Sequence, residues 1–509
     1  MLLAVSFPPL HLLIPPFVAL VPFAVFMAGL PPGGEGRAAA VRGGLVLGTL
    51  YFGALVYWIL VALIWFSKLA ILAYVGSMLL LMGLSALFAW TFHRMYHGMS
   101  VPLWLALPVA WTAAEWFRAH WPGPLAFPWL GLGSSLTGFP ELVGMAEVVG
   151  ARGVTFWLAL VNGILAGIVL RHRAGDRPVR SWGAVLLVAA LPMAWGVWRA
   201  GNLVMREAAR VAVVQPNIPE HIKLDARTAL DSTFASLDRL IPQVEPGSVD
   251  LIVLPEVALP LYPRAEYAQG WMDRVAGYAA TQGAPVLLGG LGFSGDLFGA
   301  YVPYNSAFLV TQEGLTGYQY DKRYLVPMVE RVPLLPASWL RNLRYFGKFG
   351  VGQGWPLAEV NGEGYGVLVC YESTYPEGAR HFRGAGADIL LNITNDAWYG
   401  REPWYARTTA LWQHPAHMVM RAIENRMGVA RSANTGISLF VDPVGRVYGE
   451  IELFTAGVRA EAVLTTDVTT LYTRLGDLTG NGSAMVAVLM VLASLRAGRD
   501  RDPEGPLGR

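Results

Sequence analysis

The chain has 509 residues, of which 54% are hydrophobic and only 15% are charged, and its mean hydropathy is +0.42. A soluble protein of this length exposes more charge, so the composition indicates a membrane protein. The net charge of +2 and the lack of a basic block give no indication of a nucleic-acid partner. A single cysteine excludes an intramolecular disulfide framework and a cysteine-rich metal site.

Long uncharged runs dominate the first 200 residues. A spanning helix needs roughly 20 apolar residues, and the candidate spans are 43–66, 69–92, 101–118, 153–170, 182–199 and 484–496. The first 30 residues are apolar but interrupted by two proline pairs, so we expect two short helices there, with one signal-like helix as the alternative. The sequence thus predicts a multi-pass membrane domain of about eight transmembrane helices, about seven of them ahead of a globular region.

Arginine placement predicts how the helices cross the membrane. Arg37, Arg42, Arg94, the arginine-rich loop 171–180 and the C-terminal tail all fall on one side of this arrangement. Because positively charged loops stay in the cytoplasm, the globular region is expected in the periplasm, outside a bacterial inner membrane. The expected domains are the membrane helices at 1–200, the globular domain at 205–475, a closing helix at 480–498 and a cytoplasmic tail at 499–509.

Strand-like runs alternate with helical patterns in the globular region. Strands are predicted at 210–215, 249–256, 284–290, 304–310, 365–372, 387–395 and 436–442, and helices at 225–242, 266–282 and 404–427. This alternation predicts a layered α/β domain. Glu256 and Cys370 end two of the predicted strands, where a rigid backbone can aim a reactive side chain.

Three residues of this region form a sufficient set for acyl transfer through a thioester. Glu256 follows an apolar run and a proline, where burial suits a carboxylate to act as a general base. The Cys370 thiol becomes a strong nucleophile if a cation lowers its pKa or a base removes its proton. The Lys322 ammonium could stabilise an oxyanion. Taken singly, each also has a structural explanation, as a core cysteine, a loop carboxylate and a surface lysine.

Four segments follow one another in a recognisable order. They are "LPE" (254–256), "DKRYLVP" (321–327), "VCYES" (369–373) and "NITNDAWYG" (392–400). This order resembles the nitrilase superfamily with its Glu–Lys–Cys triad and, within it, the family of membrane-embedded apolipoprotein N-acyltransferases. "VVQPNIPE" (213–220) and "RSANTGIS" (431–438) add to the resemblance, which covers almost the whole chain. It implies a nitrilase-like αββα sandwich between the block of membrane helices and the closing helix.

The resemblance also implies roles for particular residues. Glu256 corresponds to the general base, Lys322 to the oxyanion-stabilising lysine and Cys370 to the nucleophile. Further positions that the family needs are matched by Glu330, Tyr371 and Glu372. We expect Glu330 to orient Lys322 or Glu256, and the backbone N–H of Tyr371 to join the oxyanion hole.

The implied reaction is a two-step, ping-pong acyl transfer that needs no metal or organic cofactor. Cys370 takes an acyl chain from a phospholipid, which we expect to be phosphatidylethanolamine. The thioester then passes it to the N-terminal amine of S-diacylglyceryl-cysteine on an apolipoprotein, the last step of bacterial lipoprotein maturation. The enzyme is expected to be a monomer. Two alternatives remain: a membrane-anchored amidase that passes the acyl group to water, and a receptor or transporter whose outer domain only binds a ligand.

The chain departs from the family at four positions. Tyr324, Met328 and Val329 replace the histidine, phenylalanine and glycine of the usual "HLVPFGE", and Leu224 stands where a tryptophan is usual. These departures leave the triad untouched and bear on contacts with the acyl chain or the peptide. The aromatic segments 345–355 and 397–405 are candidates for a lid at the membrane surface, with packed surface turns as the alternative.

Two pairs of polar residues are interpreted as structural. His414 and His417 have a ligand-like spacing, but no third ligand of the right kind lies nearby in the sequence, so no metal site is expected. Glu115 and Arg118 end a predicted membrane helix, where we expect them to pair at the interface. Lining a lipid path is their alternative role.

Overall fold

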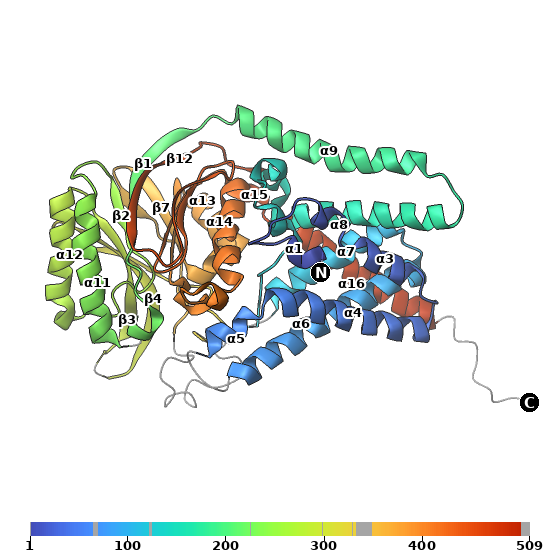
Figure 1. Cartoon of the computed structure of the whole chain (residues 1–509), viewed down its shortest axis with the longest axis horizontal. Coiled ribbons are helices and arrows are strands. Elements are labelled where there is room, and N and C mark those ends of the chain that lie inside the picture. Colours follow the sequence, from blue (N-terminus) through green and yellow to red (C-terminus); the bar gives the residue numbers. More distant parts are fainter. Residues whose placement is uncertain are drawn as a thin grey trace, which may run out of the picture.

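The computed structural model describes residues 2–64, 70–121, 125–223, 225–297, 299–327, 329–331 and 349–499. A helical part and an α/β sandwich lie end to end (Figure 1). Leu224 and Met328, two of the family departures, lie outside the described residues, as do 345–348 of the candidate lid and the tail from residue 500.

Apolar helices make up the part of the chain expected in the membrane. They are α1 (Leu2–Val5), α2 (Pro15–Val18), α3 (Val21–Ala28), α4 (Gly34–Leu55), α5 (Trp58–Leu63), α6 (Ala70–His93), α7 (Leu103–His120), α8 (Ala146–Arg173), α9 (Val179–Asn202) and α16 (Leu478–Arg499). Within the described residues, five stretches are long and apolar enough to cross a membrane: Gly34–Leu55, Ile71–Gly98, Ala146–Arg173, Val179–Asn202 and Leu478–Arg496. A shorter apolar stretch covers Pro15–Ala28. These helices confirm a multi-pass helical region with about five to six candidate spans.

The first predicted span, 43–66, has the wrong boundaries. The long helix α4 runs from Gly34 to Leu55, and residues Trp58–Leu63 form the separate helix α5. The chain turns away from the span because α5 packs on the sandwich, where the Trp58 ring lies 5.1 Å from the ring of Tyr399. The N-terminal stretch is broken as its proline pairs predict, into three short helices rather than two.

Helix α8 contains a kink that joins the two parts of the molecule. Gly150 has φ +69°, and a Cβ there would lie 2.5 Å from the ring of Tyr472, so only glycine fits this position. The next residue, Ala151, donates its backbone N–H to Oε1 of Glu424 at 2.8 Å. A carboxylate from the sandwich therefore caps the main segment of a membrane helix.

The globular region is a four-layered sandwich. One sheet has the order β12-β1-β2-β3-β4-β5 and the other β11-β10-β9-β8-β7-β6. The first sheet contains β1 (Arg206–Gln215), β2 (Leu251–Val253), β3 (Val286–Gly295), β4 (Tyr301–Thr311), β5 (Gly314–Asp321) and β12 (Gly457–Thr465). The second contains β6 (Ala358–Val360), β7 (Glu363–Val369), β8 (Ile389–Thr394), β9 (Gly428–Ala433), β10 (Ser438–Val441) and β11 (Val447–Ile451).

Helices cover the outer face of each sheet. Helices α11 (Ala226–Leu240) and α12 (Gln269–Gln282) pack on the first sheet, on the side away from the membrane helices (Figure 1). Helices α13 (Pro376–Gly384) and α14 (Ala410–Asn425) cover the second sheet and face the helical part. The αββα arrangement implied by the resemblance is therefore observed, with the second sheet nearer the membrane helices.

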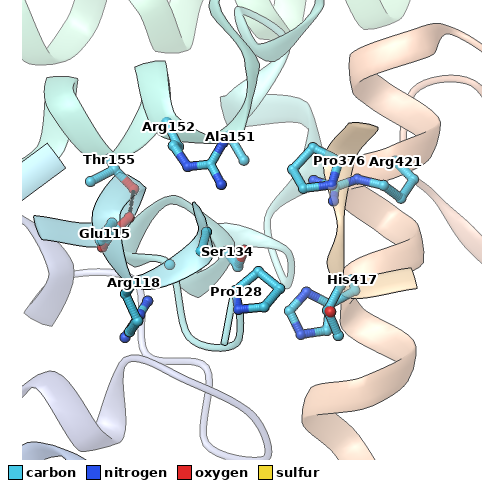
Figure 2. Close-up of a pocket in the computed structure, with 13 residues that line it drawn as sticks. Glu115, Arg118, Pro128, Ser134, Ala151, Arg152, Thr155, Pro376, His417 and Arg421 are labelled. Atoms are coloured by element: carbon cyan, nitrogen blue, oxygen red, sulfur yellow. Dashed lines mark hydrogen bonds between the residues drawn. The ribbon is translucent and has the colours of Figure 1, made fainter. Parts of the chain in front are cut away.

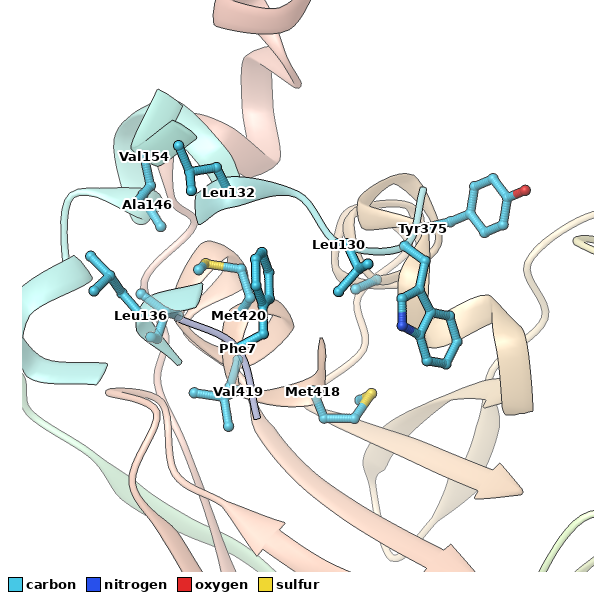
Figure 3. Packing of buried hydrophobic residues seen from close by; sticks show 14 of the residues in the cluster. Phe7, Leu130, Leu132, Leu136, Ala146, Val154, Tyr375, Met418, Val419 and Met420 are labelled. Atoms are coloured by element: carbon cyan, nitrogen blue, oxygen red, sulfur yellow. The ribbon is translucent and has the colours of Figure 1, made fainter. Parts of the chain in front are cut away.

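One apolar core runs from the helical part into the sandwich. Figure 3 shows Met418, Val419 and Met420 of α14 among Leu132 and Val154 from the membrane region. Ion pairs reinforce this contact, since Arg426 donates to Glu147 at 2.8 Å and Arg152 donates to Glu377 at 3.5 Å. Apolar contacts and ion pairs thus both join the sandwich to the membrane helices, and they hold it at one end of them.

Candidate active site

Cys370 occupies a sharp junction between a strand and a turn. It follows the last residue of β7 and begins the 3-10 turn Cys370–Thr374. Its φ of +53° is a left-handed conformation that side chains disfavour. His414 of α14 holds the turned backbone, with Nε2 3.1 Å from the Cys370 carbonyl oxygen and Nδ1 2.8 Å from Asp396 Oδ1. A strained turn of this kind presents a nucleophile at the end of a sheet.

Glu256 and Lys322 contact each other, and both charges act on the Cys370 thiol. Lys322 follows β5 and is 1% exposed, and its Nζ lies 3.4 Å from Glu256 Oε1. The same Nζ lies 3.0 Å from Glu330 Oε1. Asn305 of β4 donates to both carboxylates, at 2.7 Å to Glu256 and 2.9 Å to Glu330. One buried ammonium group is thus fixed between two carboxylates.

The backbone around Glu256 is also held firmly. Glu256 lies just beyond β2 rather than at the strand's end, and its Oε2 accepts the backbone N–H of Asn395 at 2.9 Å. Lys223 donates to the Glu256 carbonyl oxygen at 3.2 Å. Gly289 of β3 lies directly beneath, where a Cβ would be 2.7 Å from the Glu256 Cα. The close approach of β3 therefore requires glycine and sets the position of the carboxylate.

Burial and neighbouring charges define the protonation of the site. Burial raises the pKa of the Cys370 thiol well above its ordinary value, and the charge of Glu256 raises it further, whereas Lys322 and a hydrogen bond with Thr394 lower it. For Lys322, burial lowers the pKa, but Glu330 and Glu256 more than offset this effect and the pKa is raised. The lysine therefore stays an ammonium, while the thiol needs a base to lose its proton.

Glu372 connects the cysteine turn to the lysine segment. Its Oε2 accepts the backbone N–H of Val369 at 2.8 Å. Its Oε1 accepts the N–H groups of Arg323 at 2.7 Å and Tyr324 at 3.2 Å, and the hydroxyl of Tyr320 at 2.9 Å. The side chain is fully buried. Glu372 thus fixes the distance between the backbone beside Cys370 and the backbone beside Lys322.

Tyr371 and Tyr324 both pack against other aromatic rings, and Tyr371 extends the site toward the membrane helices. The Tyr371 hydroxyl donates to the Ala126 carbonyl oxygen at 3.3 Å, and its ring stacks on Trp129. Tyr324, which replaces the family's histidine, stacks on Tyr375 with ring centroids 4.1 Å apart. In the candidate lid, Trp355 stacks on His381 at 5.0 Å, so this described residue is a packed ring.

Several site residues were missed from the sequence. They are Asn305, Asn395, His414, Asp396, Glu220 and Lys223. Asn395 connects two buried carboxylates, because its backbone N–H donates to Glu256 and its side chain donates to Glu220 at 2.8 Å. The motif "NITND" marked this segment without assigning it a role. His414 and His417 have different surroundings: His414 binds Asp396 and the Cys370 carbonyl oxygen, whereas His417 packs edge-on against the Trp129 ring.

Glu115 and Arg118 do not form the expected ion pair. Glu115 accepts from Trp111 at 2.8 Å and from the Leu132 N–H at 2.7 Å, whereas Arg118 donates to the Leu130 carbonyl at 3.0 Å. Each charged group thus has a backbone partner after α7, and Glu115 also accepts hydrogen bonds from the side chains of Trp111 and Thr155. Both residues line a cavity of about 30 Å³ between the membrane helices and α14 (Figure 2).

Comparisons with known proteins agree with this architecture. Residues 210–474 match the carbon–nitrogen hydrolase family and residues 1–164 match the apolipoprotein N-acyltransferase N-terminal domain. Among curated relatives, the apolipoprotein N-acyltransferase of Geobacter metallireducens is 31% identical over 96% of this chain and 93% of its own length. That of Azotobacter vinelandii is 32% identical over 86% of this chain and 82% of its own length.

Solved structures match part of the chain. A mutant of Nesterenkonia AN1 amidase from the nitrilase superfamily has a TM-score of 0.38 and 20% identity, and the match covers 54% of this chain and 97% of the amidase. The match over nearly the full length of the Geobacter relative and the two family matches establish the relationship. The chain belongs to the apolipoprotein N-acyltransferase family of the carbon–nitrogen hydrolase superfamily.

Proposed function

We propose that the protein transfers an acyl chain from phosphatidylethanolamine to apolipoproteins through a thioester on Cys370. In the first step the thiol sulfur attacks the acyl carbonyl carbon, the C–O ester bond breaks, and a lysophospholipid leaves. In the second step the α-amine of S-diacylglyceryl-cysteine attacks the thioester, the C–S bond breaks, and the amide forms. The thiol is restored, so no cofactor is consumed.

The contact between Glu256 and Lys322 is the observation that supports this chemistry most directly. The 3.4 Å separation holds a carboxylate and an ammonium together next to a thiol that both groups influence electrostatically. Since burial raises the pKa of that thiol, Glu256 serves as the general base that takes its proton. The proton then passes to the departing lysophospholipid oxygen, and Glu256 takes a proton from the amine in the second step.

Lys322 and a backbone N–H stabilise the oxyanion in this scheme. Glu330 and Asn305 keep the ammonium in place, so it needs no reorganisation when negative charge develops on the acyl oxygen. The N–H of Tyr371, the residue after the nucleophile, supplies a second donor. One such donor contributes about 3–4 kcal/mol to transition-state stabilisation in related chemistry.

The energetics of the acyl group agree with this direction of transfer. An ester becomes a thioester and then an amide, which is the most stable of the three acyl linkages, so no ATP is required. Both substrates carry long chains, and each buried methylene contributes about 0.8 kcal/mol to membrane retention. A catalytic domain fixed to membrane helices can take up both substrates without extracting them from the bilayer.

In this proposal the sandwich, residues 205–475, lies on the periplasmic side of the bacterial inner membrane, and about eight helices cross the bilayer. The arginine-rich loop 171–180 then faces the cytoplasm. In a Cys370→Ser background, Asp231→Cys on α11 should react with a membrane-impermeant maleimide in intact spheroplasts. Arg173→Cys should react only after lysis. The reverse pattern would contradict the proposed orientation.

An acyl adduct on the single thiol tests the mechanism. Purified full-length protein is incubated with phosphatidylethanolamine in detergent, and its intact mass is measured before and after adding a diacylated lipopeptide. We expect an acyl mass increment at Cys370 that the lipopeptide removes as it becomes N-acylated, and neither event in Cys370→Ser. An adduct that decays equally fast without lipopeptide indicates a hydrolase, and no adduct indicates a domain that only binds.

A further inference from the structure

A groove of about 330 Å³ lies between the end of α7 and the segment that follows Lys322. Its walls come from the last residues of α7, from the segment after Lys322 (residues 323–325, 327 and 331) and from the start of α13. Trp121, which follows α7, is 36% exposed, as expected for a ring at a membrane–water interface. The groove is therefore located where a lipid would reach the sandwich.

The groove begins where the catalytic residues end. Arg323, in its wall, follows Lys322, and its N–H donates to Glu372 at 2.7 Å. Tyr375, which also lines the groove, donates its hydroxyl to the Ala126 carbonyl oxygen at 3.2 Å. The hydroxyl of Tyr371, the neighbour of Cys370, binds the same carbonyl oxygen. Two residues of the groove are thus sequence neighbours of the site: Arg323 follows Lys322, and Tyr375 follows the turn that begins at Cys370.

Charges of both signs line this groove. Arg323 and Arg331 supply two cations. The Arg323 guanidinium donates to the Gly354 carbonyl oxygen at 3.1 Å and lies over the Trp355 ring, whereas no carboxylate partner of Arg331 occurs among the residues that the structure describes. Glu377 supplies an anion: burial raises its pKa, but His120 and Arg152 outweigh that effect and hold the pKa at about 2. Its side chain remains 26% exposed. The Glu377 carboxylate is therefore ionised at neutral pH.

Apolar side chains line the groove together with these charges. The stacked rings of Tyr324 and Tyr375 form one wall, with Leu325 beside them. The combination of two guanidinium groups, one carboxylate and an apolar wall is complementary to a phosphate, an ammonium and the first methylenes of an acyl chain.

We propose that this groove binds the head group of a zwitterionic phospholipid donor, with Arg323 and Arg331 on the phosphate and Glu377 on the ammonium. The inference rests on the proposed function, and it assigns the specificity of the first step to these residues. Arg331 binds the phosphate that all glycerophospholipids share, whereas Glu377 distinguishes phosphatidylethanolamine from phosphatidylglycerol, which has no ammonium group.

Three acyl donors with the same chain test the groove: phosphatidylethanolamine, phosphatidylglycerol and palmitoyl p-nitrophenyl ester, which has no head group. The rate of Cys370 acylation is measured in mixed micelles for the wild type, Arg331→Gln and Glu377→Gln. Arg331 is exposed, so its substitution does not disturb a core. In Glu377→Gln, Arg152 keeps its 2.6 Å contact with Asp477. Arg459→Gln, an exposed arginine on β12, is the matched control.

In Arg331→Gln, the rates with both phospholipids should fall about tenfold relative to the ester, because a charge-assisted hydrogen bond to phosphate is lost. In Glu377→Gln, the ratio of the phosphatidylethanolamine rate to the phosphatidylglycerol rate should fall about tenfold. Arg331→Gln slowing all three donors equally, or none, would overturn the groove assignment, as would an unchanged donor ratio in Glu377→Gln. A wild-type protein that forms no adduct with any donor would overturn the proposed function as well.

Discussion

Replacing Glu372 with glutamine tests whether this buried carboxylate positions the catalytic residues. All four of its partners donate to it: three backbone N–H groups and the hydroxyl of Tyr320. An amide of the same shape keeps one oxygen, so its NH₂ must face at least one of these donors. The least disruptive orientation turns the NH₂ toward Val369, next to Cys370.

The expected reduction in the acylation rate follows from this one unpaired N–H donor. A buried donor left without an acceptor destabilises its state by about 1–3 kcal/mol. Glu372 connects the backbone beside Cys370 to the backbone beside Lys322. We therefore expect the substitution to shift these groups relative to each other and to raise the activation barrier for acylation. About 2 kcal/mol in the activation barrier corresponds to a roughly 30-fold slower acylation.

Single-turnover acylation of Cys370 by phosphatidylethanolamine, followed by intact mass, measures this effect on the folded protein. Glu359→Gln, an exposed glutamate on β6, is the matched control and should acylate within about twofold of the wild type. A Glu372→Gln protein that acylates at the wild-type rate, even with a lower Tm, would refute a positioning role, because the carboxylate would then support only the fold.

Three further predictions concern pH and stability. The rate of Cys370 methanethiolation should still be rising above pH 9, because burial raises the thiol pKa; a plateau below pH 8 would contradict this. Burial also raises the pKa of Glu220 from 4.5 to about 7. The free energy of unfolding should therefore fall by about 3 kcal/mol as the pH rises through that range, because the folded protein binds this proton more tightly than the unfolded chain does. Glu220→Gln should therefore raise the Tm at pH 8 but not at pH 4, whereas parallel Tm–pH curves would count against the buried carboxylate. Glu147→Gln leaves the buried Arg426 guanidinium without its carboxylate and should lower the free energy of unfolding by about 3–5 kcal/mol. The control Glu141→Gln breaks an exposed pair with Arg446 and should change that free energy by less than about 1 kcal/mol. Equal effects of the two substitutions would contradict the cross-domain role of Glu147.

The positions of Glu256 and Cys370 could be anticipated because each follows an apolar strand-like run, whereas Lys322 follows the polar run of β5, for which the sequence predicted no strand, and was grouped with them only through the resemblance. Strands of the two facing sheets bring such ends to one edge, as β2, β5 and β7 do here. The strand periodicity was less informative about boundaries. β2 stops at Val253, and β7 stops at Val369 because Cys370 adopts a left-handed φ that no strand pattern reveals.

The residues that support the site were harder to find. Asn305 and Asn395 are neutral, and their importance comes only from the carboxylates that the fold brings next to them. Glu115 and Arg118 are spaced for a contact on one helix face, yet backbone groups beyond α7 bind each of them instead. The sequence predicts α4 and α5 as one span because both are apolar, whereas the packing of Trp58 on Trp129 and Tyr399 separates them. In each case the decisive partner is distant in sequence.

The central claim is that Glu256, Lys322 and Cys370 act as one unit, and a double-mutant cycle on Cys370 acylation tests it most directly. Glu256→Gln, Lys322→Met and the double variant are compared with the wild type by single-turnover mass measurements. Each single substitution should slow thioester formation by about 10²–10⁴-fold. Because the two side chains cooperate on one thiol, the double variant should be about as slow as the slower single one. Reductions that simply multiply would show that the two groups act independently and would contradict the account.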